Sequence, residues 1–284
     1  NRPSTLGLSE SINDGVSWFV KRFGKLFRKA SQPMLQVILG VESIFYALPW
    51  FLFIIINGLG CYLLTKRKLL SVGVMLCFLM IKLLGLWALA LQTLSLMVIS
   101  TSISTLIGLP LGILSSKSNK FRSILLPILD GMQTMPSFVY LIPALMLFGL
   151  GKVPAVFATV IYSIVPIIRL TDLGIRSVPH SIVEAALAFG ASYSQLLLGV
   201  KLPLAIPTIM AGINQSIMLA LSMVVIASMI GARGLGEQVL LGIQKLDVGK
   251  GFIAGVGIVF LAIILDRVTQ AIGKRLDKMQ RVQS

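Results

Sequence analysis

The chain has 284 residues, of which 56% are hydrophobic and only 12% are charged. Soluble domains carry about a quarter of their residues as Asp, Glu, Lys or Arg, so this composition excludes an ordinary soluble protein. The 25 Lys and Arg against 10 Asp and Glu leave a net charge of +15. The basic residues lie mostly between apolar runs, which favours loops that face anionic lipid over a surface for nucleic acid.

The first 43 residues are predicted to form an N-terminal tail with an amphipathic helix. Apolar and basic residues follow each other at i, i+4 and i+8 spacing, which indicates a helix lying on a membrane surface, with an ordinary solvated helix as the alternative. The apolar members are Trp18, Phe19, Phe23, Leu26 and Phe27. The basic members are Lys21, Arg22, Lys25, Arg28 and Lys29.

Seven apolar segments follow, and a helix needs roughly 20 such residues to cross a bilayer. Residues 44–92 are predicted to hold two scaffold helices, the first at about 44–64 and the second at the start of 69–115. The run 69–115 is too long for one crossing and divides near Gly85–Gln92. The remaining five spans form a core domain over 93–272, followed by a basic tail at 273–284. Their predicted bounds are about 93–115, 133–150, 153–175, 204–231 and 252–272.

The fold class is therefore an all-α integral membrane protein. Lys and Arg cluster in three loops and in the tail, at 66–68, 117–122, 169–201 and 274–281. With seven crossings these clusters share one side, which the positive-inside rule makes the cytoplasm. The same odd number places the basic N-terminal helix outside, against that rule. Either this helix is held at the outer interface or the division of 69–115 is wrong.

The loop at about 177–203 carries the strongest functional signal. Residues Glu184 to Phe189 are predicted to form a short helix, which Gly190 stops by taking the left-handed conformation. Ser192-Tyr-Ser-Gln195 has the S-x-x-Q form of a capping box and predicts a second short helix. Pro203 is expected to end that second helix, and Pro207 to begin the next span. Small residues on the first helix would let another protein approach closely.

This loop resembles the EAA motif of the permease subunits of binding-protein-dependent ABC importers, E-A-A-x3-G-x9-[I/V]-x-L-P. Every defining position matches, with Val200 where Ile is usual. The resemblance implies a type I importer fold and a coupling helix that docks on an ATP-binding subunit. The residues it assigns to this docking are Glu184, Ala185, Ala186, Phe189, Gly190, Ala191, Leu202 and Pro203. A chance connector helix in another transporter is the alternative.

Two longer runs, 129–143 and 207–229, resemble the permease of glycine betaine and proline betaine importers, which carry quaternary ammonium osmoprotectants. The glycine-rich turn 230–236 resembles one common in the wider family. Prolines inside the spans and polar residues on the 204–231 helix indicate a pathway, with contacts between helices as an equal alternative. The candidate pathway residues are Gln133, Phe138, Tyr140, Asn214, Met218 and Ser222.

Charged and small residues at the spans have simpler interpretations. Arg169, Asp172 and Arg176, spaced i+3 and i+4, are predicted to form a charge ladder. The pairs Gly108/Gly112 and Gly251/Gly255 predict close helix contacts.

The chain has no G-x-x-x-x-G-K-[ST] phosphate loop, so it is expected to be a non-catalytic subunit that binds no cofactor or metal itself. By the resemblance, ATP and Mg belong to two ATPase subunits, and the other partners are a second copy of the permease, an extracytoplasmic substrate-binding protein and the lipid bilayer of a prokaryotic plasma membrane. An ion-driven carrier and a membrane-embedded enzyme are the rival functions. The first would need internal repeats and paired intramembrane acids, and the second a clustered acid, base or metal set.

Overall fold

The structure is a computed structural model that describes residues 8–283, with the backbone alone for several residues before Ser31 and for all residues after Arg275. Every regular element in this part of the chain is a helix. The side chains of Phe19, Lys21, Phe23, Lys25, Leu26, Arg28, Lys278 and Arg281 lie outside the described residues.

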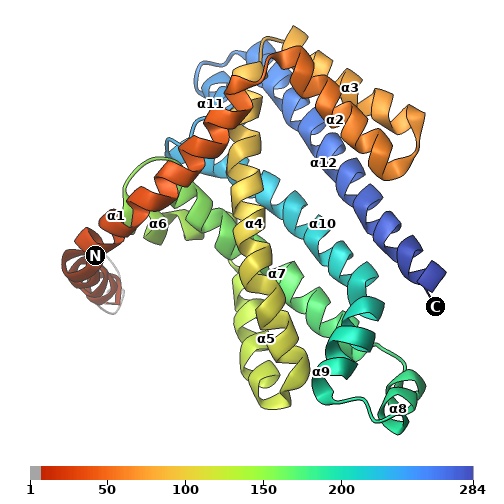
Figure 1. Cartoon of the computed structure of the whole chain (residues 1–284). Coiled ribbons are helices and arrows are strands. Elements are labelled where there is room, and N and C mark those ends of the chain that lie inside the picture. The colour runs from red at the N-terminus through yellow and green to blue at the C-terminus, as the bar shows by residue number, and fades with distance from the viewer. Residues whose placement is uncertain (1–7, 284) are drawn as a thin grey trace.

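The chain begins with a long helix and a helical hairpin (Figure 1). These are α1 (Leu8–Ala47), α2 (Trp50–Thr65) and α3 (Lys68–Leu83). The second half of α1, Ser31–Ala47, meets α2 at 99°. If α2 crosses the bilayer, this part of α1 therefore runs along the membrane surface, as an interfacial helix does. Phe27 of the predicted apolar stripe packs edge-to-face on Phe148, with ring centroids 5.8 Å apart.

The core follows as further helices joined by short irregular turns. The elements before the loop at 177–203 are α4 (Trp87–Lys117), α5 (Asn119–Thr134), the 3₁₀ turn η1 (Ser137–Tyr140), α6 (Leu141–Phe148) and α7 (Lys152–Arg176). The later elements are α8 (His180–Ala188), α9 (Tyr193–Gln195), the π-helical η2 (Leu196–Lys201), α10 (Leu202–Ala227), η3 (Ser228–Ile230), α11 (Leu235–Gln244) and α12 (Val248–Gln283).

Helix α7 lies at the centre, packed between α4 and α10 (Figure 1). Glycines permit both close crossings. A Cβ on Gly108 or Gly112 of α4 would lie within 3.0 Å of Ile167 or Thr171, and one on Gly212 of α10 would lie 3.1 Å from the Pro166 carbonyl oxygen. The predicted Gly108/Gly112 contact is thus confirmed. Of the second pair, Gly251 contacts Gly242 of α11, whereas nothing lies within 4 Å of a Cβ at Gly255.

The number of membrane crossings depends on how bent helices are counted. Four helices in the described part of the chain are long and apolar enough to span a membrane. The number rises to six if each of two bent helix pairs is counted as one span. The predicted second span, α3, has only 16 residues. A helix of that length reaches about 24 Å, which is short for the hydrocarbon core of a bilayer. The predicted division of 69–115 agrees with the break between Leu83 and Trp87.

The predicted start of the fourth span is wrong. The fourth span does not begin near residue 133, because it starts as α5 at Asn119 and bends by 108° after Thr134. Met135 and Pro136 are extended there, and the missing N–H of Pro136 explains the break. Pro143 lies within the first turn of α6, where a helix needs no N–H, and causes no break.

Candidate functional site

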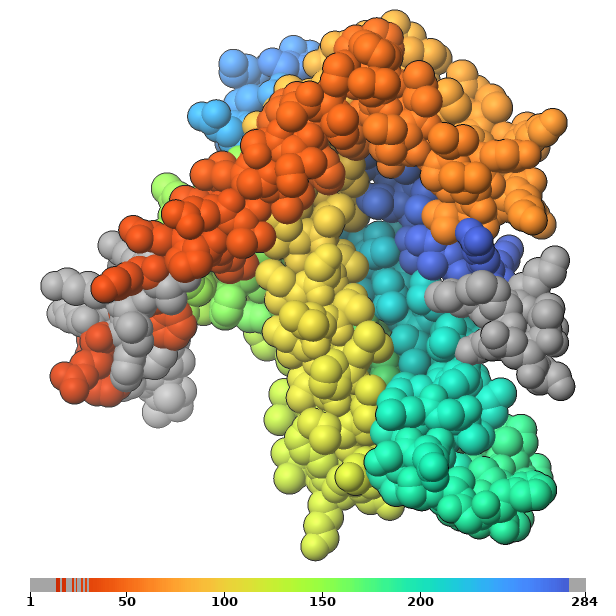
Figure 2. Space-filling view, in the orientation of Figure 1, coloured from red at the N-terminus to blue at the C-terminus, as the bar shows by residue number. Residues whose placement is uncertain are grey.

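The loop between α7 and α10 projects from one end of the molecule (Figures 1 and 2). Its first helix, α8, begins directly after Pro179, which presets a helical entry, and none of its residues is buried. His180 Nδ1 lies 3.0 Å from Glu184 Oε1, one turn along the helix. The predicted short helix is present, but it begins at His180 and not at Glu184. Its Glu184 and Ala185 face solvent while Ala186 is half-buried.

Gly190 ends α8 in the way the sequence predicts. It has φ +79°, in the left-handed region that L side chains rarely adopt. Its N–H donates to Leu187 O at 2.9 Å, and the Ala191 N–H donates to Ala186 O at 3.1 Å. These two bonds form a Schellman motif, which satisfies the last carbonyls of α8 and sets the direction in which the chain leaves.

A capping box begins the second helix of the loop. Ser192 Oγ accepts from the Gln195 N–H, and Gln195 Oε1 accepts from the Ser192 N–H at 2.8 Å. This is the predicted arrangement. The expectation that Pro203 ends this helix is wrong, because the helix continues from Tyr193 to Ile230 without a break. The π turn η2 allows this, because its i→i−5 bond from Leu202 N–H to Leu197 O carries the chain past the ring of Pro203.

Apolar side chains point away from this loop into solvent. Phe189 is 93% exposed and Leu187 is 52% exposed. The Tyr193 ring is 49% exposed and has Lys117 Nζ of α4 over it, 4.8 Å from its centroid. Exposed apolar patches of this kind mark surfaces that another protein covers. By contrast, the predicted docking residues Leu202 and Pro203 are half-buried at the start of α10, where Leu202 packs against Ile175, Ala205 and Ile209. Leu202 and Pro203 therefore support the loop, whereas Phe189 lies on the exposed surface that a partner could contact.

The candidate pathway residues do not form one continuous lining. Gln133 and Phe138 are exposed on either side of the α5–α6 break. Ser222 is exposed on α10, a helix that η1 contacts. Tyr140 is buried and its hydroxyl donates to Met132 O across the break. Met218 is half-buried. Asn214 Nδ2 donates to Asp266 Oδ1 of α12 at 3.2 Å, so this residue joins two helices.

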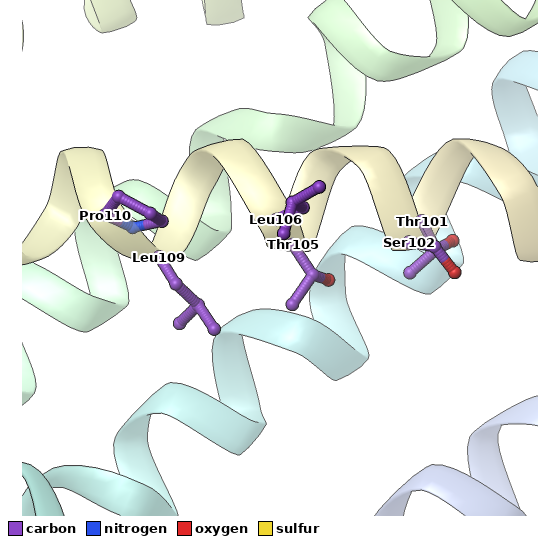
Figure 3. A pocket seen from close by; sticks show the side chains of 6 residues that line it. All are labelled: Thr101, Ser102, Thr105, Leu106, Leu109 and Pro110. Atoms are coloured by element: carbon purple, nitrogen blue, oxygen red, sulfur yellow. The ribbon is translucent and has the colours of Figure 1, made fainter.

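One face of α4 is hollowed where the sequence analysis predicts no site. A groove of about 470 Å³ lies along α4, and Thr105 and Leu109 point from it toward α10 (Figure 3). A smaller cavity of about 200 Å³ adjoins it between α4, Ile217 of α10 and Leu265 of α12. Hydroxyl residues inside an apolar run, Thr101, Ser102 and Thr105, are the signal that could have indicated this groove.

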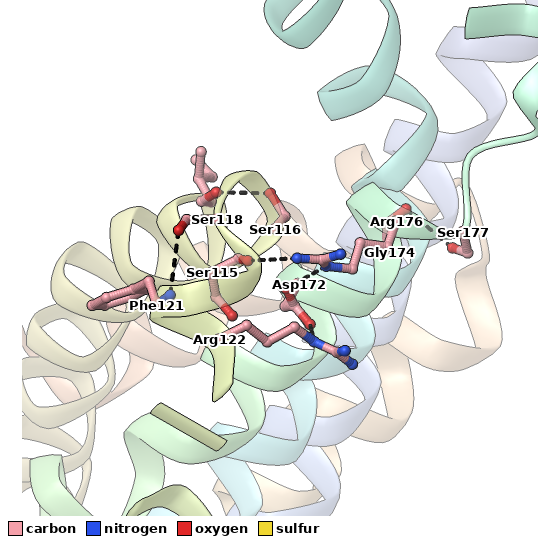
Figure 4. A network of polar contacts seen from close by, with 10 residues as sticks. Ser115, Ser116, Ser118, Phe121, Arg122, Asp172, Gly174, Arg176 and Ser177 are labelled. Atoms are coloured by element: carbon pink, nitrogen blue, oxygen red, sulfur yellow. Dashed lines mark hydrogen bonds and ion pairs between the residues drawn. The ribbon is translucent and has the colours of Figure 1, made fainter. Parts of the chain in front are cut away.

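The predicted charge ladder on α7 is only half right. Asp172 and Arg176 do pair, Oδ1 to Nε at 3.1 Å. Arg169 pairs instead with Asp130 of α5, and Arg122 of α5 takes the second oxygen of Asp172 at 3.0 Å (Figure 4). Sequence spacing cannot show this, because these partners come from a different helix.

Comparison with known proteins identifies the family of this helical bundle. Residues 104–278 match the family described as the binding-protein-dependent transport system inner membrane component. The chain belongs to this family. It is therefore a multi-pass permease component of a transport system in the plasma membrane.

Several curated relatives cover nearly the whole chain. It is 46% identical to the glycine betaine/proline betaine transport system permease protein ProW of Escherichia coli (strain K12), over 94% of this chain and 75% of the relative. It is 51% identical to the glycine betaine/carnitine transport permease protein GbuB of Listeria monocytogenes, over 94% of each. The glycine betaine transport system permease protein OpuAB of Bacillus subtilis is 44% identical, over 96% of each.

A solved structure shares the fold. A chain of the MetNI methionine ABC transporter, in an inward facing conformation, has a TM-score of 0.56 and 22% identity over 68% of this chain and 93% of that one. The bundle of α4 to α12 is thus the fold of an ABC importer permease, as the sequence predicts.

Proposed function

We propose that this permease moves glycine betaine, proline betaine or a related quaternary ammonium solute into the cell, driven by ATP hydrolysis on separate ATPase subunits. The substrate class is supported by the relatives, three of which are glycine betaine permeases 44–51% identical over most of the chain. The proposal that separate subunits hydrolyse the ATP is supported by the absence of a phosphate loop from this sequence.

One observation carries the coupling part of this proposal, namely the exposed end of α8. A helix of nine residues with no buried side chain, followed by a Phe that is 93% exposed, presents an apolar surface of the kind that another protein covers. In the proposed assembly two ATPase subunits each receive one such helix, since each permease copy supplies one. The assembly then contains two permease copies and an extracytoplasmic binding protein.

In this mechanism the permease itself selects substrate weakly. A quaternary ammonium ion is held by aromatic faces, and the one exposed aromatic ring among the candidate pathway residues in the described part of the chain is Phe138. Selection therefore falls to the binding protein, and the permease supplies alternating access past the α5–α6 break and α10. The chain itself acts as a non-catalytic subunit that holds no cofactor.

Uptake of labelled glycine betaine tests this function. Cells lacking their own betaine importers receive the permease, the ATPase and the binding protein, and competition by proline betaine, carnitine, choline and trimethylamine N-oxide ranks the substrates. We expect saturable uptake that stops when the ATPase is inactivated. Uptake that persists without any ATPase would contradict the proposal in favour of an ion-driven carrier, and no uptake of any of these compounds would exclude the substrate class.

A further inference from the structure

The coupling loop is joined to the pathway through the cytoplasmic half of α7. Helix α7 ends at Arg176, and α8 begins shortly afterwards at His180. A displacement of α8 by a partner is therefore passed to α7 through this short connection, and also to η2, which α8 contacts directly. The exposed pathway residues Gln133 and Phe138 lie on either side of the α5–α6 break and not on α7. A displacement of α7 therefore has to be passed on to reach them, and α5, which contacts α7, is one route.

Two ion pairs bind α5 to α7. Asp172 of α7 has a side chain only 3% exposed, and its two oxygens accept from Arg122 Nε of α5 at 3.0 Å and Arg176 Nε at 3.1 Å (Figure 4). Arg169, one turn earlier on α7, pairs with Asp130, which lies further along α5 than Arg122. The two pairs therefore hold α5 to α7 at two separate points along α5.

The same part of α7 is also tied to α4. Arg176 Nη2 donates to the Ser115 carbonyl oxygen at 2.9 Å, in the last turn of α4. An arginine has several donors in a fixed fork, so Arg176 binds Asp172 and Ser115 at once. Asp172 is thus the buried charge on which the cytoplasmic ends of α4, α5 and α7 converge.

The side chains on the two sides of the α5–α6 break pack in different hydrophobic clusters. Before the break, Leu129 of α5 packs against Ile164, Val165 and Ile168 of α7. After it, Tyr140 and Leu141 pack in a different cluster, with the outer half of α7 and with α10. Between these two clusters Met135 and Pro136 are extended and bridge a 108° bend. A break of this kind absorbs a change of angle in few residues.

We propose that α5 and the cytoplasmic half of α7 move as one body, and that Asp172 is the positioning residue that carries displacement of α8 to a hinge at Met135–Pro136. This inference rests on the proposed coupling function. The ion pairs keep α5 in register with α7 while α8 moves, so the change of angle falls on the hinge. Gln133 and Phe138, on its two sides, then change their relative positions.

The first test removes the α5 side of the link without stranding a buried charge. Arg122→Gln leaves Asp172 paired with Arg176, and Lys120→Gln removes the same charge from an exposed neighbour that makes no ion pair in the described structure. The complex with ATPase and binding protein is reconstituted in liposomes, and betaine transported per ATP hydrolysed is measured. Arg122→Gln should lower this ratio by about fivefold or more, the lower end of usual coupling effects. Arg122→Lys should restore much of it, and Lys120→Gln should leave it unchanged.

The second test locks the parts together with a flexible thiol cross-linker and does not depend on a weakened variant. Asp130→Cys with Arg169→Cys joins α5 to α7, and if they move as one body the transport per ATP is kept. Thr134→Cys with Val139→Cys joins the two sides of the hinge at exposed positions outside the candidate pathway, and transport should stop until the linker is cleaved. The reverse pattern would overturn the inference, as would equal ratios for Arg122→Gln and Lys120→Gln. If the unmodified complex shows no ATP-driven uptake at all, the proposed function fails instead.

Discussion

Replacing Lys152 by Met should detach α1 from the outer end of the core. Lys152 is the first residue of α7 and pairs with Glu42 of α1. The Glu42 side chain is 9% exposed and that of Lys152 is 17% exposed. Loss of one partner leaves a buried carboxylate without its counter-ion, and such changes cost about 3–5 kcal/mol. Because Lys152 keeps some contact with solvent, we expect about 3 kcal/mol, the lower end of that range.

A cost of this size appears as a shift in the docking equilibrium of α1. Since about 1.4 kcal/mol corresponds to a factor of ten, a cost of about 3 kcal/mol means roughly a hundredfold more frequent opening. Hydrogen exchange of the backbone amides around Ile38, which is fully buried against the core, measures this opening directly. Exchange there should become faster in Lys152→Met, while the amides of α7 near Val165 should change little.

A double variant separates the ion pair from simple packing. Glu42→Gln combined with Lys152→Met removes both charges and should return exchange close to that of the unaltered protein, since replacing a whole buried pair is often nearly neutral. Lys82→Met is the matched control, because Lys82 is a half-buried lysine in the last turn of α3 that makes no ion pair in the described structure. Unchanged exchange in Lys152→Met, or a double variant worse than the single one, would refute this reasoning.

Two further predictions concern glycines, each with a matched control. Gly112→Ala should lower the thermal stability of the purified protein, because its Cβ would lie 2.5 Å from the Thr171 Cβ and 2.9 Å from a backbone oxygen of α7. In Gly255→Ala the Cβ meets nothing within 4 Å, so stability should be unchanged, and equal melting temperatures for the two variants would contradict the packing account. Gly190→Val forces a branched residue to φ +79°, which costs of order 1–3 kcal/mol and should release the co-purified ATPase. Gly199→Ala, in the π turn at ordinary φ, should retain it, and retention in both variants would count against a role for the Gly190 turn.

The structure explains why the coupling loop could be predicted and the α5–α7 contact could not. The signals at Gly190 and Ser192 are local, since a left-handed glycine and a capping box need only their own neighbours along the chain. Helix α5 was not predicted as part of the bundle, because its sequence contains charged residues. The structure pairs two of these charges with residues of α7. Arg122 therefore fell in a predicted basic loop and Asp130 just before a predicted span, and only the three-dimensional contacts reveal their partners.

Helix continuation was misjudged for a related reason. A proline such as Pro203 normally ends a helix, and nothing in its neighbours signals the π turn that carries the chain past it. The family resemblance drawn from the EAA pattern was confirmed by the match over residues 104–278. The individual roles given to the docking and pathway residues remain predictions, and the two tests at the α5–α6 hinge address the latter.

The account depends most directly on α8 facing the cytoplasm against another protein. A single cysteine at Phe189→Cys, in a chain with Cys61→Ala and Cys77→Ala, reports both properties through its reaction with a membrane-impermeant maleimide and its cross-linking in the assembled complex. The account predicts no labelling in intact cells, labelling after the membrane is opened, and a cross-link to the ATPase subunit. Labelling of intact cells, or a cysteine that cross-links to no other polypeptide, would contradict it.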